Sequence, residues 1–235
     1  MKELTLIKTI LWDLDNTLID FDIAEKNAIK SLFEKYNLGP CTDSMLKEYD
    51  KINKAYWRKF EKNEIDKKLG LVQRYVDFFK LYNLDTSIAS EFNDKYQLAL
   101  GDTIIYLDDS YNIIKSLKGK VRQCLVSNGT TAAQRNKLKK SKFDELFDEV
   151  FLSDEIGFEK PSVEFFDYVF DKIGLTDKSE VIIVGDSISS DIQGGENAGI
   201  KTVWYNPKGK GHNERPRVDY DIRDLREVYK ILGLE

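Results

Sequence analysis

Short apolar runs alternate with helix-like segments along most of the chain. From about residue 107 onward, runs that predict buried strands are followed by stretches with apolar residues at every third or fourth position. The predicted strands cover residues 9–12, 121–126, part of 147–152, 181–184 and 202–205. The predicted helices of this part cover residues 111–117, 131–141, 161–173, 189–198 and 224–232. The alternation predicts an α/β fold, with a parallel sheet covered by helices on both faces.

The segment that follows the first predicted strand has a purely helical pattern of apolar residues. Residues 20–100 contain no strand pattern, and their apolar positions have helical spacing. We therefore expect two domains, an α/β core made of residues 1–15 and 102–235 and an all-helical cap made of residues 16–101. The junctions near residues 15–20 and 101–109 are candidate hinges.

Composition and charge narrow the class of protein. The 235-residue chain is 41% hydrophobic and 33% charged, with a formal net charge of -5. The negative balance argues against binding to a nucleic-acid polymer. No run approaches the ~20 apolar residues that span a membrane, and the first residues do not have the pattern of a signal peptide. We therefore expect a cytoplasmic protein with no membrane association.

The first predicted strand ends in two carboxylates, Asp13 and Asp15. Residues i and i+2 of an extended segment point the same way, so both side chains can face one small volume. Two carboxylates 4 Å apart repel each other by roughly 4 kcal/mol at an effective dielectric of about 20. A divalent cation such as Mg²⁺ would compensate this charge. Alternatively, Asp15 and Asn16 belong to an ordinary turn after a strand.

Further polar clusters follow other predicted strands or precede predicted helices. Because the carboxyl ends of parallel strands share one edge of a sheet, these clusters can converge near the two aspartates. Each cluster alone is typical of a turn, a solvated lysine or a helix cap, whereas together they favour phosphoryl transfer. The clusters are Ser127-Asn128-Gly129, Lys160, and Asp186 followed five residues later by Asp191.

The two aspartates and the lysine have the chemistry that this transfer needs. Asp13 is ionised at neutral pH and can attack phosphorus to form an aspartyl-phosphate. Asp15 can protonate the leaving oxygen and later deprotonate the attacking water. Lys160 supplies a positive charge for the phosphate and for Asp13.

Phosphate binding is expected from the cluster after the second predicted strand. The Ser127 hydroxyl, the Asn128 amide and nearby backbone N–H groups can hold phosphoryl oxygens, together with Lys160. Gly129 has no side chain and lets the backbone approach the phosphate closely.

A metal site is expected from the carboxylates. Asp186 completes a set of hard oxygen ligands for Mg²⁺ with Asp13 and Asp15. Asp191 lies about one helical turn further along and could orient a metal-bound water or Lys160.

The motifs at positions 13–17, 127–129, 160–161 and 185–191 together resemble those of the haloacid dehalogenase (HAD) superfamily of aspartyl-phosphate hydrolases. The resemblance covers the whole chain, including a helical cap inserted after the first motif. It implies a Rossmann-like core with strand order 5-4-1-2-3 and Mg²⁺ as the cofactor. It also implies that the backbone carbonyl of Asp15, rather than its side chain, binds the ion.

A finer resemblance is to the pyrimidine 5′-nucleotidase branch, which hydrolyses modified pyrimidine monophosphates. It rests on residues 49–53 with Trp57 and Phe60, and on residues 127–130 and 186–199. The substrate implied is a small phosphomonoester, a nucleoside monophosphate. The cap is rich in aromatic residues, and a base stacked on one ring gains ~1–3 kcal/mol. Trp57, Tyr56 and Phe21 are the candidate contacts, although an aromatic stripe at helical spacing is also typical of a helix core.

Other functions are compatible with the same core motifs. A phosphoglycolate or sugar-phosphate phosphatase would use identical core chemistry with a different cap. A haloacid dehalogenase would need neither Mg²⁺ nor the second aspartate of the first motif, yet Asp15 and Asp186 are both present. A regulatory protein that had lost activity would be expected to lack one of the five core residues Asp13, Asp15, Ser127, Lys160 and Asp186.

Overall fold

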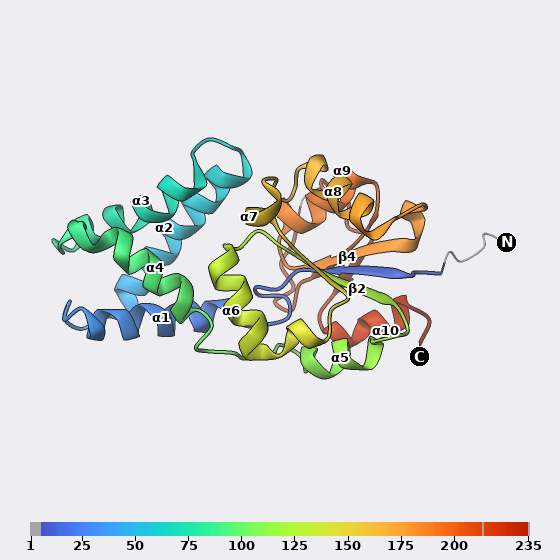
Figure 1. Cartoon of the computed structure of the whole chain (residues 1–235), viewed down its shortest axis with the longest axis horizontal. Helices are drawn as coiled ribbons and strands as arrows, with labels where there is room; N and C mark the ends of the chain where they lie inside the picture. Colours follow the sequence, from blue (N-terminus) through green and yellow to red (C-terminus); the bar gives the residue numbers. More distant parts are fainter. Residues whose placement is uncertain (1–5, 213, 235) are drawn as a thin grey trace. The chain divides into compact units, whose positions relative to one another are not determined.

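The chain folds into two compact units, one of which contains a sheet. The computed structural model describes residues 6–212 and 214–234. The first unit contains the described residues up to Asp20 and those from Ile104 on, and the second contains Phe21–Thr103. The strands of the first unit are β1 (Thr9–Trp12), β2 (Arg122–Ser127), β3 (Glu149–Leu152), β4 (Val181–Gly185), β5 (Lys201–Tyr205) and β6 (Tyr220–Ile222), as Figure 1 shows in part.

The sheet has the order β3-β2-β1-β4-β5-β6, and all neighbouring strands are parallel. This confirms the expected order of the first five strands. The edge strand β6 was not expected, because it has three residues and its Tyr220 and Asp221 are exposed, so it forms no apolar run. Trp12 is in register with Leu125 and Val184, and β1, β2 and β4 therefore end at the same edge.

Helices cover both faces of this sheet, as expected (Figure 1). Alternate residues of β1 face opposite sides, so that Ile10 and Trp12 join one apolar cluster while Leu11 joins the other. On the first face lie α5 (Ser110–Leu117), α6 (Thr131–Ser141) and α10 (Val228–Ile231). On the second lie α8 (Val163–Ile173) and α9 (Gln193–Ala198). Shorter segments are η2 (Phe143–Glu145), α7 (Ser153–Ile156), η3 (Lys178–Glu180) and η5 (Leu225–Glu227).

Two helices begin differently from the sequence prediction. Pro161 lies ahead of α8, because the Ser162 side chain caps this helix by accepting a hydrogen bond from Phe165 N at 3.3 Å. The segment predicted as a helix from residue 189 starts instead as a π-helical turn, η4 (Ile188–Ile192), and continues as α9. This wider turn follows directly after β4 and carries part of the candidate site.

The second unit is all-helical and has an aromatic core. Tyr49 stacks on Tyr75 with ring centroids 5.1 Å apart, and Phe92 packs against Tyr75 at 4.9 Å. No helix of either unit, within the residues described, is long and apolar enough to cross a membrane. The helices of the second unit are α1 (Phe21–Lys35), α2 (Asp43–Glu61), α3 (Lys67–Leu81), η1 (Thr86–Ile88) and α4 (Ala89–Ala99).

A buried polar network joins these helices. Arg74 is 1% exposed and donates hydrogen bonds to Asn53 Oδ1 at 2.5 Å and to Asn93 Oδ1 at 3.2 Å. Glu25 Oε1 accepts hydrogen bonds from Asn53 Nδ2 at 2.7 Å and from the Tyr96 hydroxyl at 2.8 Å. Each charged group therefore has polar partners, which is the condition for burying it without a large penalty.

The stability of this helical unit should depend on the protonation of Glu25. Burial raises the pKa of Glu25 from 4.5 to about 7, although the Tyr96 hydrogen bond and Arg74 oppose the shift. The unfolded chain therefore binds fewer protons between pH 4.5 and 7, and the free energy of unfolding should fall across that interval by up to about 3 kcal/mol. Glu25→Gln should lack this decrease in the free energy of unfolding between pH 4.5 and 7. Urea denaturation of both proteins at several pH values measures the difference. Glu34→Gln, at an exposed position of the same helix, should keep the wild-type pH dependence, and an identical pH dependence in Glu25→Gln would contradict the assignment.

Candidate active site

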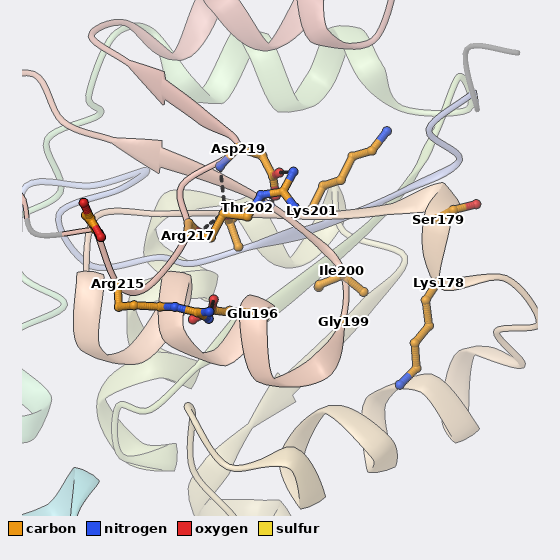
Figure 2. Close-up of a pocket in the computed structure, with 11 residues that line it drawn as sticks. Lys178, Ser179, Glu196, Gly199, Ile200, Lys201, Thr202, Arg215, Arg217 and Asp219 are labelled. Atoms are coloured by element: carbon orange, nitrogen blue, oxygen red, sulfur yellow. Dashed lines mark hydrogen bonds and ion pairs between the residues drawn. The ribbon is translucent and has the colours of Figure 1, made fainter. Parts of the chain in front are cut away.

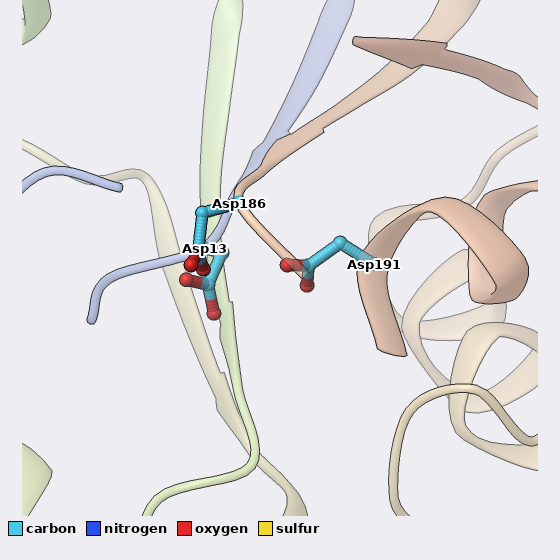
Figure 3. Close-up of side chains that lie close together, drawn as sticks. All are labelled: Asp13, Asp186 and Asp191. Carbon is cyan, nitrogen blue, oxygen red and sulfur yellow. The ribbon is translucent and has the colours of Figure 1, made fainter. Parts of the chain in front are cut away.

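Acidic side chains from two adjacent strands meet at the carboxyl edge of the sheet. Asp13 directly follows β1, and its backbone N–H donates to Val184 O at 2.9 Å, so it stays attached to β4. Asp186 directly follows β4, and Asp191 lies in η4. One carboxylate oxygen from each of the three lies within 4.8 Å of the others (Figure 3).

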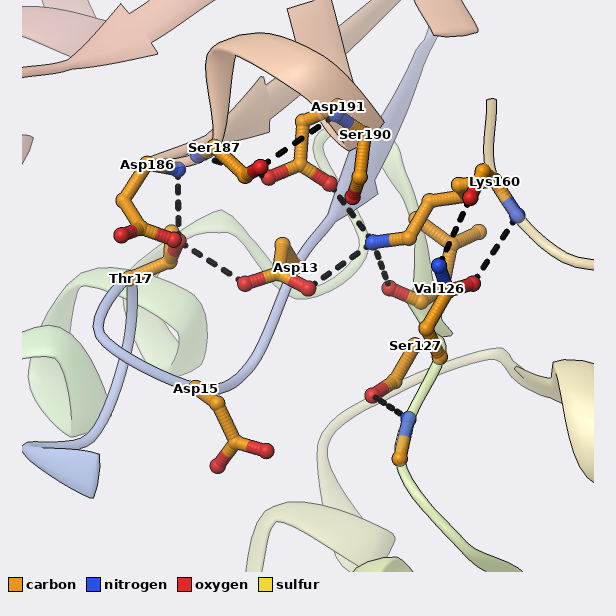
Figure 4. Close-up of polar contacts among 12 residues, drawn as sticks. Asp13, Asp15, Thr17, Val126, Ser127, Lys160, Asp186, Ser187, Ser190 and Asp191 are labelled. Carbon is orange, nitrogen blue, oxygen red and sulfur yellow. Dashed lines mark hydrogen bonds and ion pairs between the residues drawn. The ribbon is translucent and has the colours of Figure 1, made fainter. Parts of the chain in front are cut away.

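Lys160 binds two of these carboxylates. Its Nζ donates to Asp13 Oδ1 at 2.8 Å, to Asp191 Oδ1 at 2.6 Å and to Val126 O at 2.9 Å (Figure 4). These three acceptors match the three protons of an ammonium group. Burial disfavours the ammonium form of Lys160, which is 1% exposed, but Asp13 and Asp191 outweigh this effect and hold its pKa above the ordinary value. Lys160 is therefore a fixed positive charge.

Asp13 is held by a second partner as well. The Thr17 hydroxyl donates to Asp13 Oδ2 at 3.0 Å and accepts from the backbone N–H of Asp186 at 3.1 Å. Burial and the Asp191 carboxylate raise the pKa of Asp13 to about 7, while Lys160 opposes the rise. No role of Thr17 was predicted from the sequence, although this residue belongs to the first motif.

The three carboxylates fit a divalent cation. Among the described residues, none donates a hydrogen bond to the Asp186 carboxylate, and burial together with Asp13 and Asp191 raises its pKa well above the ordinary value. Both oxygens of Asp191 are already engaged, with Lys160 and with Ser187 N at 3.1 Å. Asp186 is therefore the carboxylate most open to an ion, and Asp13, whose two oxygens each accept one hydrogen bond, is the neighbouring candidate ligand. Oxygen donors of this kind suit Mg²⁺.

Asp191 reaches this position because β4 ends in glycine. A Cβ atom added at Gly185 would lie 2.2 Å from Asp191 Oδ2, closer than any real contact. The π-helical turn η4 brings Asp191 over this glycine, with Asp191 N donating to Ser187 O at 3.0 Å and Ile192 N donating to the same oxygen at 3.1 Å. Gly185 and η4 thus place a buried carboxylate beside Lys160.

The Asp15 carboxylate points away from this cluster (Figure 4). Its Oδ2 accepts from Gln134 Nε2 at 2.8 Å, and its Oδ1 accepts from Lys137 Nζ at 2.6 Å. The expectation that Asp13 and Asp15 face one volume required an extended backbone, but β1 ends at Trp12 and Asn16 has a φ of 61°. The carboxylate of Asp15 is thus absent from the group of three, and only its backbone carbonyl is left as a candidate ligand.

Ser127 and Asn128, at the end of β2, contact different groups. Ser127 Oγ accepts hydrogen bonds from Gly129 N at 3.2 Å and from Gln134 Nε2 at 2.7 Å. Asn128 was expected to bind phosphate through its amide, but that amide binds the backbone of Lys160, with Nδ2 donating to the carbonyl at 2.7 Å and Oδ1 accepting from the N–H at 2.9 Å. Asn128 therefore holds Lys160 in position.

The candidate aromatic contacts lie in the helical unit. Tyr56 is 7% exposed, packs with Phe60, and donates its hydroxyl to Asp77 Oδ2 at 2.6 Å. This ring and its hydroxyl are thus occupied inside the unit. Trp57 and Phe21 are half-buried, and Trp57 packs edge-on against Phe60 with centroids 5.4 Å apart.

A pocket of about 700 Å³ lies elsewhere in the α/β unit (Figure 2). Lys201, the first residue of β5, lines it, so the pocket is at the amino end of that strand rather than at the carboxyl edge. Ion pairs join Arg215 to Glu196 at 2.5 Å and Arg217 to Asp219 at 2.7 Å within its walls. None of the candidate site residues lines this pocket, and its arginines are neutralised.

Several known proteins are similar to almost the whole of this chain. The HAD-hydrolase YfnB of Bacillus subtilis is 34% identical over 228 residues, which cover 97% of this chain and 96% of that protein. A crystal structure of YfnB bound to magnesium has a TM-score of 0.90 at 33% identity, covering 97% of this chain and 99% of that one.

Two nucleotidases are also similar along almost their whole length. The pyrimidine 5′-nucleotidase PynA of Streptococcus pneumoniae is 29% identical over 226 residues, covering 96% of this chain and 94% of that protein. The pyrimidine 5′-nucleotidase YjjG of Escherichia coli is 26% identical over 223 residues, covering 95% and 96%. The sequence model for haloacid dehalogenase-like hydrolases matches residues 10–205. The resemblance inferred from the motifs is confirmed: the chain belongs to the haloacid dehalogenase-like hydrolase family.

Proposed function

We propose that the protein is a Mg²⁺-dependent phosphomonoester hydrolase that acts through an aspartyl-phosphate on Asp13. The observation that carries this proposal is the buried group of three carboxylates, Asp13, Asp186 and Asp191, around the ammonium of Lys160. When all three carboxylates are ionised, one ammonium leaves this group with net negative charge, which supports binding of a cation. Asp13 and Asp186 would hold the ion, which when bound neutralises the charge of the phosphoryl oxygens.

The residues around Asp13 support its role as the nucleophile. Lys160 and Thr17 each bind one of its oxygens and so fix the orientation of the carboxylate. In the first half-reaction an Asp13 oxygen forms a bond to phosphorus as the bond to the leaving oxygen breaks, and Asp15 gives that oxygen a proton. In the second half-reaction water attacks the same phosphorus, Asp15 takes up a proton from the water, and Asp13 is restored.

Ser127 is suited to bind the phosphoryl group. Its Oγ is nearly buried and already accepts two hydrogen bonds, from Gly129 and Gln134. No described residue accepts its proton. This hydroxyl is therefore free to donate to a phosphoryl oxygen, as a phosphate site requires.

For the substrate we propose a pyrimidine nucleoside monophosphate. The support comes from the two similar proteins that are pyrimidine 5′-nucleotidases and from the half-buried Trp57, whose ring could stack on a base.

Phosphate release from a panel of monophosphates, with Mg²⁺ and with EDTA, tests both the metal-dependent phosphatase mechanism and the pyrimidine nucleotide substrate. The panel contains dUMP, dTMP, UMP, a 5-halo-dUMP, AMP, phosphoglycolate and glucose 6-phosphate. We expect release that is led by the pyrimidine nucleotides and lost in EDTA. Trp57→Ala should raise KM for the nucleotides by roughly 5- to 150-fold, which corresponds to one lost stacking contact of ~1–3 kcal/mol.

The possible results of this panel distinguish a wrong substrate from a wrong mechanism. Release led by phosphoglycolate or glucose 6-phosphate would retain the role of Asp13 and reject the nucleotide assignment. Release that persists in EDTA would reject the metal-dependent mechanism. Absence of release from every compound would reject the phosphatase assignment for this set of substrates.

A further inference from the structure

Helix α6 provides two donors that hold Asp15 from one side. Gln134 and Lys137 are one turn apart on this helix, and their side chains lie on the same face. Both are almost fully buried, at 0% and 1% exposed, which is unusual for a lysine on a short helix. The ammonium of Lys137 binds one oxygen of Asp15 and the amide of Gln134 binds the other.

Gln134 also links Asp15 to the candidate phosphate site. Its Nε2 donates to Ser127 Oγ at 2.7 Å as well as to Asp15, so one amide group spans both residues. With the amide turned over, Oε1 would face the Asp15 carboxylate, and two acceptors would repel each other. Its Oε1 accepts no hydrogen bond from the described residues, which leaves the two donor bonds to fix this orientation.

Gly129 is the residue that makes room for this link. A Cβ atom at position 129 would lie 2.0 Å from Gln134 Nε2 and 2.5 Å from its Cδ. Gln134 therefore crosses directly over the backbone of the second motif. Gly129 was expected to let the backbone approach the phosphate, and in the structure the group nearest to a Cβ at this position is the Gln134 amide.

We propose that Gln134 and Lys137 are positioning residues, which hold the Asp15 carboxylate as the base for hydrolysis of the phosphorylated enzyme. This inference rests on the proposed function. Because both oxygens of Asp15 accept hydrogen bonds, these two residues fix the orientation of its carboxylate. Gln134 additionally fixes Ser127 as a donor, because it occupies an acceptor position on that hydroxyl.

The chemical step balances with these groups alone. Water oxygen forms a bond to phosphorus, and the bond between phosphorus and the Asp13 oxygen breaks. The electron pair of that bond returns to Asp13 as a carboxylate. One water proton passes to Asp15, and the other remains on the hydrogen phosphate that leaves. The Asp15 proton is then available for the leaving oxygen of the next substrate.

The test uses p-nitrophenyl phosphate, whose leaving group needs no proton, in rapid-mixing experiments with Mg²⁺. Formation of the aspartyl-phosphate should then be insensitive to Asp15, while its hydrolysis should slow. Lys137→Met should release one p-nitrophenolate per chain in a burst at the wild-type rate. Gln134→Leu, which also loses the hydrogen bond to Ser127, should keep the burst amplitude. Their steady-state rate should follow at about 10- to 100-fold below that of the wild type.

The burst also counts folded chains, so a variant that fails to fold is recognised by its amplitude. Lys139→Met, an exposed position on the same helix, should behave as the wild type, and Lys137→Arg should recover part of the steady-state rate because it keeps a cation. Equal slowing of the burst and the steady state, or unchanged steady-state rates, would overturn the positioning role. A wild-type protein that releases no p-nitrophenolate would instead contradict the proposed function itself.

Discussion

Asp13→Asn is expected to reduce phosphate release by about 10⁴-fold or more, the scale of loss when a covalent nucleophile is removed. Asparagine has nearly the same shape and keeps an oxygen that can accept from Lys160 or from Thr17. It cannot form an acyl phosphate by displacing the leaving oxygen. The loss should therefore appear in kcat, with the far-ultraviolet circular dichroism unchanged.

The matched control for this variant is Asp144→Asn, an exposed aspartate of the same unit. Its phosphate release should equal that of the wild type. If Asp13→Asn kept more than about a tenth of the wild-type kcat, far above the residual rate expected after loss of a nucleophile, the nucleophile would have to be a different group.

Lys160→Met should lower the free energy of unfolding by about 3–5 kcal/mol at neutral pH, as expected when one partner of a buried ion pair is removed. Asp13 and Asp191 would lose their shared cation while they remain buried. The result is measured by urea denaturation in the absence of divalent ions. Lys120→Met replaces an exposed lysine of the same unit and should change stability little.

The loss in free energy of unfolding caused by Lys160→Met should also depend on pH. Burial already raises the pKa of Asp13 to about 7 with Lys160 in place, and loss of the ammonium raises it further. A carboxyl group with a raised pKa in the folded state loses stability as pH rises through that pKa. The difference between wild type and variant should therefore grow from pH 5 to pH 8. A difference that shrinks over this range would contradict the assigned charges.

The positions of most strands could be predicted from the sequence, because these strands are apolar and buried. The run Val181–Val184 has one plausible structure in an α/β chain, a strand covered on both faces, and it is buried throughout. The strand β6 has no such signal, since it consists of three residues held at the sheet edge by pairing with β5. The π-helical turn η4 was likewise not predicted, because its geometry depends on packing of Asp191 over Gly185.

Positions in the candidate site were predictable where a strand end determines them. Asp13, Ser127 and Asp186 each end or follow a strand of the parallel sheet, so the topology alone brings them to one edge. The partners of Asp15 were not predictable, because Gln134 and Lys137 are ordinary polar residues of a helix until α6 packs. A buried lysine on that helix leaves no periodic signal in the sequence.

Chemical trapping of the aspartyl-phosphate tests the central claim most directly. The wild-type protein is quenched during turnover of p-nitrophenyl phosphate with Mg²⁺, and borohydride then reduces an acyl phosphate to the alcohol, which converts the aspartate to homoserine. Peptide mass spectrometry locates the change. The mechanism predicts homoserine at position 13, dependent on substrate and Mg²⁺ and absent from Asp13→Asn. Homoserine at another position, or none at any position while Lys137→Met shows a full burst, would contradict it.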